Sequence, residues 1–164
     1  MRSPNFPSSL FALSRAASAL ALAVLVLSGC ASSKALFQSK IALKDVHFSV
    51  LEKANDNMPF SVDLVVVSDE TLLPALLAMN AAQWFDPATN FRRDHPASLA
   101  IWPYELTPGL SKPVTDARFA QRRTRAVLLF ANYKGKGPYR LRLDNVPVAT
   151  VLFLEKTIKL AEQP

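Results

Sequence analysis

The sequence is poor in the residues on which most enzyme and metal sites depend: its 164 residues include one cysteine, two histidines and four glycines. A single cysteine can form neither an intrachain disulfide nor a zinc site of several cysteines. His47 and His95 have no cysteine or pair of acids near them at ligand spacing, and His47 is expected to be solvated. No Gly-x-Ser-x-Gly motif and no glycine-rich phosphate loop occurs. We therefore predict no catalytic residues, no metal site and no cofactor, and we do not expect an enzyme.

Charged residues are scarce in the first 29 positions, where only Arg2 and Arg15 are charged. Between Arg15 and Cys30 lies a run of small and apolar residues with no charge and no proline. A basic start, a short apolar core and small residues at the end are typical of a secretory signal peptide. The run is shorter than the roughly 20 apolar residues that a membrane-spanning helix needs. We therefore predict a cleaved signal peptide over residues 1–29.

Cys30 ends a motif that predicts lipid attachment. Residues 27–30, Leu-Ser-Gly-Cys, resemble the bacterial lipobox, in which two small residues admit the peptidase and the cysteine becomes the new N-terminus. The resemblance implies a diacylglycerol thioether on the Cys30 sulfur and an acyl chain on its amine. Because one acyl chain binds a membrane only marginally, several chains make a stable anchor. The alternative is an ordinary signal peptide followed by a coincidental cysteine.

The residue after Cys30 predicts where the anchored protein goes. Ala31 stands where an aspartate is associated with inner-membrane retention, so we expect an outer-membrane lipoprotein that faces the periplasm. Residues 30–39 are small and mostly polar, and we interpret them as the lipidated cysteine and a flexible tether. The basic segment 118–125 is interpreted as a solvated strand end, because nucleic acid is an implausible partner for an exported protein.

Residues 40–164 carry a pattern of short strands separated by turns. Apolar and polar residues alternate, or apolar residues run together, at 41–50, 60–67, 99–106, around Val114, at 126–133, at 139–144 and from 148 to the end. Such patterns are typical of strands. Pro103 favours an edge position for its strand, and Thr107-Pro108-Gly109 predicts a type II turn. The sequence therefore predicts a mainly-β domain, a β-sandwich of about seven or eight short strands.

One segment has helical periodicity instead. From Leu72 to Trp84 apolar residues recur at spacings of three and four. Thr71 is the predicted cap, which puts Pro74 in the first turn, where its missing N–H does no harm. We predict one helix here, followed by a loop over residues 86–98. At the C-terminus one continuing alternation is predicted to place four side chains on a common face: Leu152, Leu154, Ile158 and Leu160.

Several segments of the mature chain resemble the TssJ family, the outer-membrane lipoproteins of type VI secretion. A lipobox and a short tether precede the first strand, and an asparagine-rich loop that ends in proline, residues 55–59, leads into the valine-rich strand. Residues 105–109, Glu-Leu-Thr-Pro-Gly, are similar to the family's Leu-x-Pro-Gly turn. The strand at 126–133 and the Tyr139-Arg140 pair resemble the family's valine-rich strand and its aromatic-arginine pair. These matches indicate a divergent member.

The resemblance implies a fold and a role. The fold is a transthyretin-like β-sandwich with one added helix. The role is non-catalytic: the protein anchors the trans-envelope secretion complex to the outer membrane by binding the periplasmic C-terminal region of TssM. In the family, the loop between the first two strands contributes to that contact. By position, this loop corresponds here to Lys53, Ala54, Asn55, Asp56, Asn57 and Met58.

The residues leave two other functions open. One is a lipoprotein that pilots or chaperones a different envelope machine, which neighbouring genes would reveal. The other is a small-ligand-binding lipoprotein that uses Trp102, Tyr104 and the 86–98 loop, which a deep apolar pocket would favour. Tryptophans such as Trp84 and Trp102 are more often core residues than ligand platforms.

Replacing Cys30 with serine tests the lipid anchor. The change removes the sulfur that carries the lipid and leaves the β-domain untouched. We expect Cys30→Ser to be folded but absent from the outer-membrane fraction in flotation experiments, whereas the control Ser32→Ala stays with the membrane. Membrane association of the Cys30→Ser variant equal to that of wild type would count against this cysteine as the anchor.

Overall fold

The computed structural model describes residues 41–115, 117 and 124–162. The predicted signal peptide, Cys30, the tether and most of the basic segment 118–125 lie outside the described residues. The described residues all belong to one compact unit. In that part, no helix combines the length and the hydrophobicity needed to cross a membrane.

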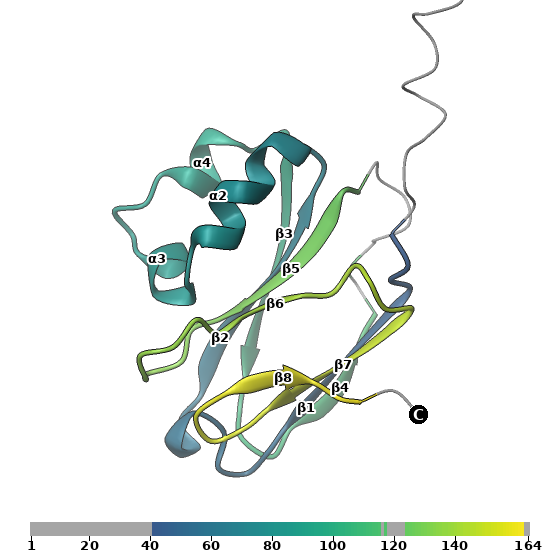
Figure 1. Ribbon diagram of the computed structural model, residues 1–164. Helices are drawn as coiled ribbons and strands as arrows, with labels where there is room; N and C mark the ends of the chain where they lie inside the picture. Colours follow the sequence, from purple (N-terminus) through teal and green to yellow (C-terminus); the bar gives the residue numbers. More distant parts are fainter. Residues whose placement is uncertain (1–40, 116, 118–123, 163–164) are drawn as a thin grey trace, which may run out of the picture. The chain divides into compact units, whose positions relative to one another are not determined.

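Two four-stranded sheets build the domain (Figure 1). The first has the order β4 (Ser111–Val114), β1 (Asp45–Val50), β7 (Val148–Phe153) and β8 (Ile158–Leu160). The second has the order β3 (Leu99–Leu106), β2 (Phe60–Val67), β5 (Ala126–Ala131) and β6 (Arg140–Arg142). Paired strands are antiparallel except β1 and β7, which run parallel. The predicted mainly-β sandwich is confirmed.

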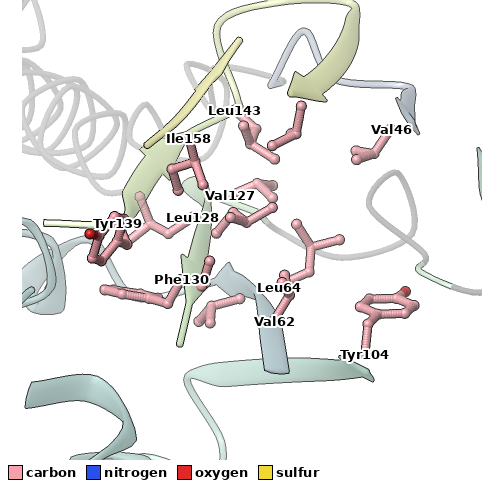
Figure 2. Close-up of a cluster of buried hydrophobic side chains, with 14 of the residues drawn as sticks. Val46, Val62, Leu64, Tyr104, Val127, Leu128, Phe130, Tyr139, Leu143 and Ile158 are labelled. Atoms are coloured by element: carbon pink, nitrogen blue, oxygen red, sulfur yellow. The ribbon is translucent and has the colours of Figure 1, made fainter. Parts of the chain in front are cut away.

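Alternate side chains of both sheets fill the space between them. The Phe48 ring of β1 packs edge-to-face on Tyr104 of β3, with centroids 5.3 Å apart, and on Phe153 of β7, at 5.5 Å. Phe60 of β2 contacts the same Phe153 ring at 5.3 Å. Figure 2 shows Leu64 of β2 and Tyr104 within a cluster of buried hydrophobic side chains. Each fully buried aromatic or leucine side chain contributes about 1.5–3 kcal/mol to folding, so these contacts hold the two sheets together.

A helical insertion between β2 and β3 covers the other face of the second sheet (Figure 1). It consists of the 3-10 helix η4 (Glu70–Leu72) and the α-helices α2 (Leu73–Ala78), α3 (Ala81–Phe85) and α4 (Phe91–Asp94). Leu76 of α2 and Trp84 of α3 are fully buried. The Trp84 ring stacks on Phe130 of β5 with centroids 4.7 Å apart. Trp84 is therefore a core residue, as predicted.

The predicted helical segment over residues 72–84 is present, but it forms two short helices rather than one. Met79 has an extended ψ of 136°, which ends α2. The Asn80 side chain accepts from the Gln83 N–H, and the Gln83 side chain accepts from the Asn80 N–H. This reciprocal capping box starts a new helix. The break therefore has a local sequence signal, Asn-x-x-Gln, which the helical periodicity obscures.

The start and the end of the insertion also differ from the sequence prediction. Asp69, not Thr71, caps the first turn by accepting from the Thr71 N–H at 3.0 Å. Pro74 does lie in the first turn of α2. α4 forms within residues 86–98, where the sequence predicts only a loop.

Asp63 of β2 binds the insertion to the sheet. It is 3% exposed, and its Oδ2 accepts from Trp84 Nε1 and from Arg92 Nη1, each at 2.9 Å. The Arg92 guanidinium also lies 5.7 Å from the centroid of the Trp84 ring. Burial raises the pKa of Asp63 above its usual 3.8, because lost hydration outweighs the lowering effects of Trp84 and Arg92.

The C-terminal alternation is interrupted by a turn. β7 and β8 form an antiparallel hairpin, so residues 148–160 are not one continuing strand. In β7 the buried residues are Ala149, Val151 and Phe153, whereas Leu152 is half-buried on the other face. The prediction of one continuing alternation over the even positions is therefore wrong, and in β7 the odd-numbered face is the buried one. The reason is that the Phe153 ring fills the centre of the sandwich and fixes which face of the strand is buried.

The first strand begins later than its alternation suggests. Residues 41–44 are not in a strand, and β1 begins at Asp45, although Leu43 is buried. Pro103 lies on an edge strand, as predicted.

The β3–β4 turn is as predicted. The Leu110 N–H donates to Thr107 O at 3.2 Å, and Gly109 has a φ of 81°. A type II turn requires this positive φ at its third position.

Replacing Asp63 with asparagine tests whether burial dominates at this carboxyl. Because the folded-state pKa is raised, Asp63 favours the folded state most below about pH 4, and this contribution is lost as the pH rises through the folded pKa. We therefore compare the unfolding free energies of wild type and Asp63→Asn by urea denaturation at several pH values. We expect the value of wild type minus that of the variant to decrease as the pH rises from about 4 through the folded-state pKa.

The control is Asp69→Asn, for which the unfolding free energy of wild type minus that of the variant should increase as the pH rises. Hydrogen bonds from the Thr71 side chain and backbone lower the pKa of Asp69, so its contribution is lost as the pH falls. An advantage of wild type over Asp63→Asn that grows with pH would show that the ion pair with Arg92 dominates instead.

Candidate docking surface

Loops of both sheets meet at one end of the sandwich, opposite the end where the chain enters β1 (Figure 1). They are the β1–β2 loop (51–59), the β3–β4 turn (107–110), the β5–β6 loop (132–139) and the β7–β8 loop (154–157). Val50, the last residue of β1, pairs with Phe153, the last of β7, and its N–H donates to Leu110 O at 2.8 Å. β1 has six residues, so the loops lie about 20 Å from the chain entry.

The predicted partner loop, residues 53–58, has an unusual backbone. Within the 3-10 turn η3 (Ala54–Asn57), three consecutive residues lie in the left-handed region: Asn55 at φ 51°, Asp56 at 54° and Asn57 at 61°. This conformation costs roughly 1–2 kcal/mol per residue for most L-amino acids. Asparagine and aspartate adopt it more readily than other side chains. The Asn-Asp-Asn sequence therefore matches the backbone that it has to form.

The six residues predicted to contact a partner fall into two groups. Four are exposed: Lys53, Asp56, Asn57 and Met58. The other two, Ala54 and Asn55, are buried, with 0% and 5% exposure. Only the exposed group can touch a partner directly, and the buried pair contributes to the shape of the loop.

Asn55 connects the loops by hydrogen bonds. Its Nδ2 donates to Met58 O at 3.2 Å and to Pro59 O at 3.4 Å, within its own loop. Its Oδ1 accepts from the Lys134 N–H of the β5–β6 loop at 2.8 Å. Its backbone N–H donates to Leu154 O of the β7–β8 loop at 3.4 Å. One buried side chain and its backbone thus join three loops.

An open hollow of about 520 Å³ lies beside the left-handed turn. It is lined by Glu52, Lys53, Asp56, Asn57 and Glu155. A second hollow, of about 550 Å³, is lined by Leu51, Glu52, Lys53, Leu154 and Glu155. Leu51 and Met58, each 45% exposed, add apolar area to this charged rim. We call the exposed part of residues 51–58, together with residues 154–155, the loop-end surface.

Four residues of the loop-end surface lie outside the predicted partner loop: Leu51, Glu52, Leu154 and Glu155. The resemblance indicates only residues 53–58, whereas Leu154 and Glu155 come from a loop about a hundred positions further along the chain. The two loops meet because β1 and β7 pair in parallel and end together. A parallel pairing of distant strands leaves no local signal that sequence analysis could use.

The β5–β6 loop packs closely on the Tyr139 ring. A Cβ at Gly137 would lie 2.7 Å from Tyr139 Cζ, and one at Gly135 would overlap the Tyr139 hydroxyl. The two glycines therefore permit a close approach of backbone and ring. The neighbouring Tyr133 ring lies 4.8 Å from Tyr139, and its hydroxyl donates to Leu154 O at 2.9 Å. Burial raises the pKa of Tyr133, so this hydroxyl stays a donor.

The candidate ligand and metal residues are dispersed. In the parts of the chain that the structure describes, no group of three or more histidine, cysteine, aspartate and glutamate side chains could hold a metal ion. His47 is exposed on β1, as predicted, and His95 packs on the Phe91 ring at 4.7 Å. Tyr104 is 7% exposed in the core and Trp102 is half-buried on β3. Neither Tyr104 nor Trp102 lines the two hollows described above.

Solved structures from type VI secretion (T6SS) share this fold. The T6SS lipoprotein TssJ1 from Pseudomonas aeruginosa matches with a TM-score of 0.57 and 16% identity, over 73% of this chain and 95% of that chain. The domain has the TssJ fold. The structure described as the C-terminal domain of the T6SS protein TssM, from EAEC, matches with a TM-score of 0.55 and 13% identity, over 73% of this chain and 97% of that chain.

A type VI membrane complex gives a TM-score of 0.54 and 14% identity, over 73% of this chain and 99% of that chain. No protein-family model matches the sequence, and no curated protein does. The TssJ fold is thus shared at low sequence identity, as expected for a divergent chain.

Replacing Gly137 with alanine tests the packing of the β5–β6 loop. The new methyl group would meet the Tyr139 ring, so we expect the unfolding free energy to fall by about 1–3 kcal/mol in urea denaturation. The control is Lys136→Ala, because Lys136 is exposed between the two glycines. Equal stability of the two variants would show that Tyr139 does not constrain this loop.

Proposed function

We propose that this protein is a lipid-anchored periplasmic docking protein of a type VI secretion membrane complex, which tethers a TssM-like partner to the outer membrane. The observation that carries the proposal is the TssJ fold, which spans 95% of the lipoprotein TssJ1. The lipobox at Cys30 and the likeness to a structure named for the TssM C-terminal domain support it. The proposed role is binding rather than catalysis, with lipid attached at Cys30.

The position of the loops suits a tether. The segment that carries Cys30 joins the domain where β1 begins, and the loop-end surface lies at the other end of β1. A partner can therefore reach this surface without competing with the point where the anchor is attached.

The edges of the sheets favour docking through loops. β3 and β4 carry Pro103 and Pro113 within the strand, where proline offers no N–H. β6 and β8 have three residues each, and Arg140 of β6 donates to Leu77 O and Met79 O of the insertion. Short edges and edge prolines discourage the addition of a further strand. Binding by β-augmentation is therefore disfavoured, and the loop-end surface is the better docking site.

The two alternatives are distinguishable from this proposal. A small-ligand site at Trp102 and Tyr104 is disfavoured because Tyr104 packs on Phe48 in the core. A pilot protein for another envelope machine would use the same kind of surface, and it would differ in the protein that it binds.

Removing apolar surface from the loop end tests the proposal. The double variant Leu51→Ser/Met58→Ser replaces two side chains that are each 45% exposed. We expect roughly thirtyfold weaker affinity for the periplasmic C-terminal domain of TssM from the same organism, because each of the two side chains contributes about 1 kcal/mol when a partner buries it. Calorimetry on the soluble chain from Ala31 onward measures the affinity, and the melting temperature should not change.

The matched control is Val148→Ser. Val148 is 41% exposed and lies at the opposite end of the domain, paired with Asp45. Its replacement should leave the affinity unchanged. Equal effects of the control and the double variant would contradict docking at the loop end, and wild-type binding to a different envelope protein in place of TssM would favour the pilot alternative.

A further inference from the structure

We infer that Asn55 is a positioning residue, which locks the β1–β2, β5–β6 and β7–β8 loops into a single pre-formed docking surface. This inference rests on the proposed function, because it concerns the surface that the partner is proposed to bind. Asn55 itself is buried and does not reach the partner. Its effect on binding is exerted through the exposed residues of the loops that it holds.

The hydrogen bonds of Asn55 join segments that are distant in sequence. Lys134, whose N–H donates to Asn55 Oδ1, is 79 positions away. The two Nδ2 bonds, to Met58 O and Pro59 O, fix the end of the loop next to exposed Met58. Both the donor and the acceptor group of this amide are thus used, and no shorter polar side chain could make the same set of bonds.

The backbone of the same turn reaches the β7–β8 loop. The Asn55 N–H donates to Leu154 O and the Asp56 N–H donates to Glu155 O, each at 3.4 Å. Glu155 lines the hollow together with Asp56. The left-handed turn therefore sets where Glu155 lies relative to the β1–β2 loop. Tyr133, which donates to Leu154 O, ties the β5–β6 loop to the same carbonyl group.

The strained backbone explains why such a lock is needed. Three successive left-handed residues, 55–57, would relax to other conformations in an isolated loop. Unfavourable backbone conformations persist only where the surroundings over-determine them. Here the buried amide of Asn55 supplies that constraint. The loop therefore loses its conformational entropy when the domain folds, and it does not lose this entropy again when a partner binds.

The decisive variant is Asn55→Gly, with Asn57→Gly as its matched control. Both positions have positive φ, which glycine adopts freely, so neither change forces the backbone. Asn55→Gly removes the bonds to Lys134, Met58 and Pro59, whereas Asn57 is exposed on the loop surface. A difference between the two variants therefore reports on the side chain of Asn55.

Amide hydrogen exchange in the free domain tests the lock without a partner. We expect the amides of Lys134, Asp56 and Met58 to exchange about tenfold faster in Asn55→Gly than in wild type or in Asn57→Gly, since each of them depends directly or indirectly on Asn55. Faster exchange at Lys134 alone would overturn the inference, because Asn55 would then affect only its own hydrogen bond to Lys134 and not the arrangement of the other loops.

Affinity for the TssM C-terminal domain tests the consequence for docking. Asn55→Gly should bind about tenfold more weakly, with the loss mainly in a slower association, whereas Val148→Ser, which lies outside the loop-end surface, should bind like wild type. Unchanged affinity in Asn55→Gly, together with weaker binding by Leu51→Ser/Met58→Ser, would overturn the positioning role and leave the proposed function standing. Unchanged affinity in both variants, with the exchange result as expected, would instead refute the docking surface.

Discussion

β2 is buried on both faces at every residue except half-buried Ser61, and the architecture of the domain follows from covering it. On one face, Phe60 packs against the first sheet through the Phe153 ring. On the other face, Asp63 accepts hydrogen bonds from Trp84 and Arg92 of the helical insertion. A strand with two buried faces needs a covering layer on each side. The insertion is therefore part of the core, and it directly follows the strand that it covers.

The strands could be predicted from sequence because their patterns are local. The valine run of β2 and the proline of edge strand β3 each report the environment of their own segment. Contacts between distant residues could not be predicted. The parity of β7 depends on where Phe153 packs in three dimensions, whereas the capping box at Asn80 is a local signal that the helical periodicity obscured. Like the parity of β7, the Asp63–Trp84 bond has no local signal, because its partners are 21 positions apart.

In the candidate site, too, local features could be predicted from the sequence and contacts between distant residues could not. Family resemblance indicates the β1–β2 loop, and its Asn-Asp-Asn sequence is consistent with the left-handed turn that the loop forms. The resemblance does not distinguish the exposed Met58 from the buried Asn55, because burial here depends on Lys134 in another loop. It also does not include Glu155, which joins the surface through the parallel pairing of β1 and β7. The surface is a property of the sandwich end rather than of one loop.

Site-specific photo-crosslinking in intact cells tests whether the loop-end surface contacts a TssM-like partner. A photoreactive amino acid is placed at Met58, at the loop end, or at Val148, at the opposite end, in the full-length, lipid-modified protein. We expect a covalent adduct with a TssM-like protein from position 58 and none from position 148. An adduct from position 148 alone, or adducts from position 58 that contain only another envelope protein, would contradict this contact.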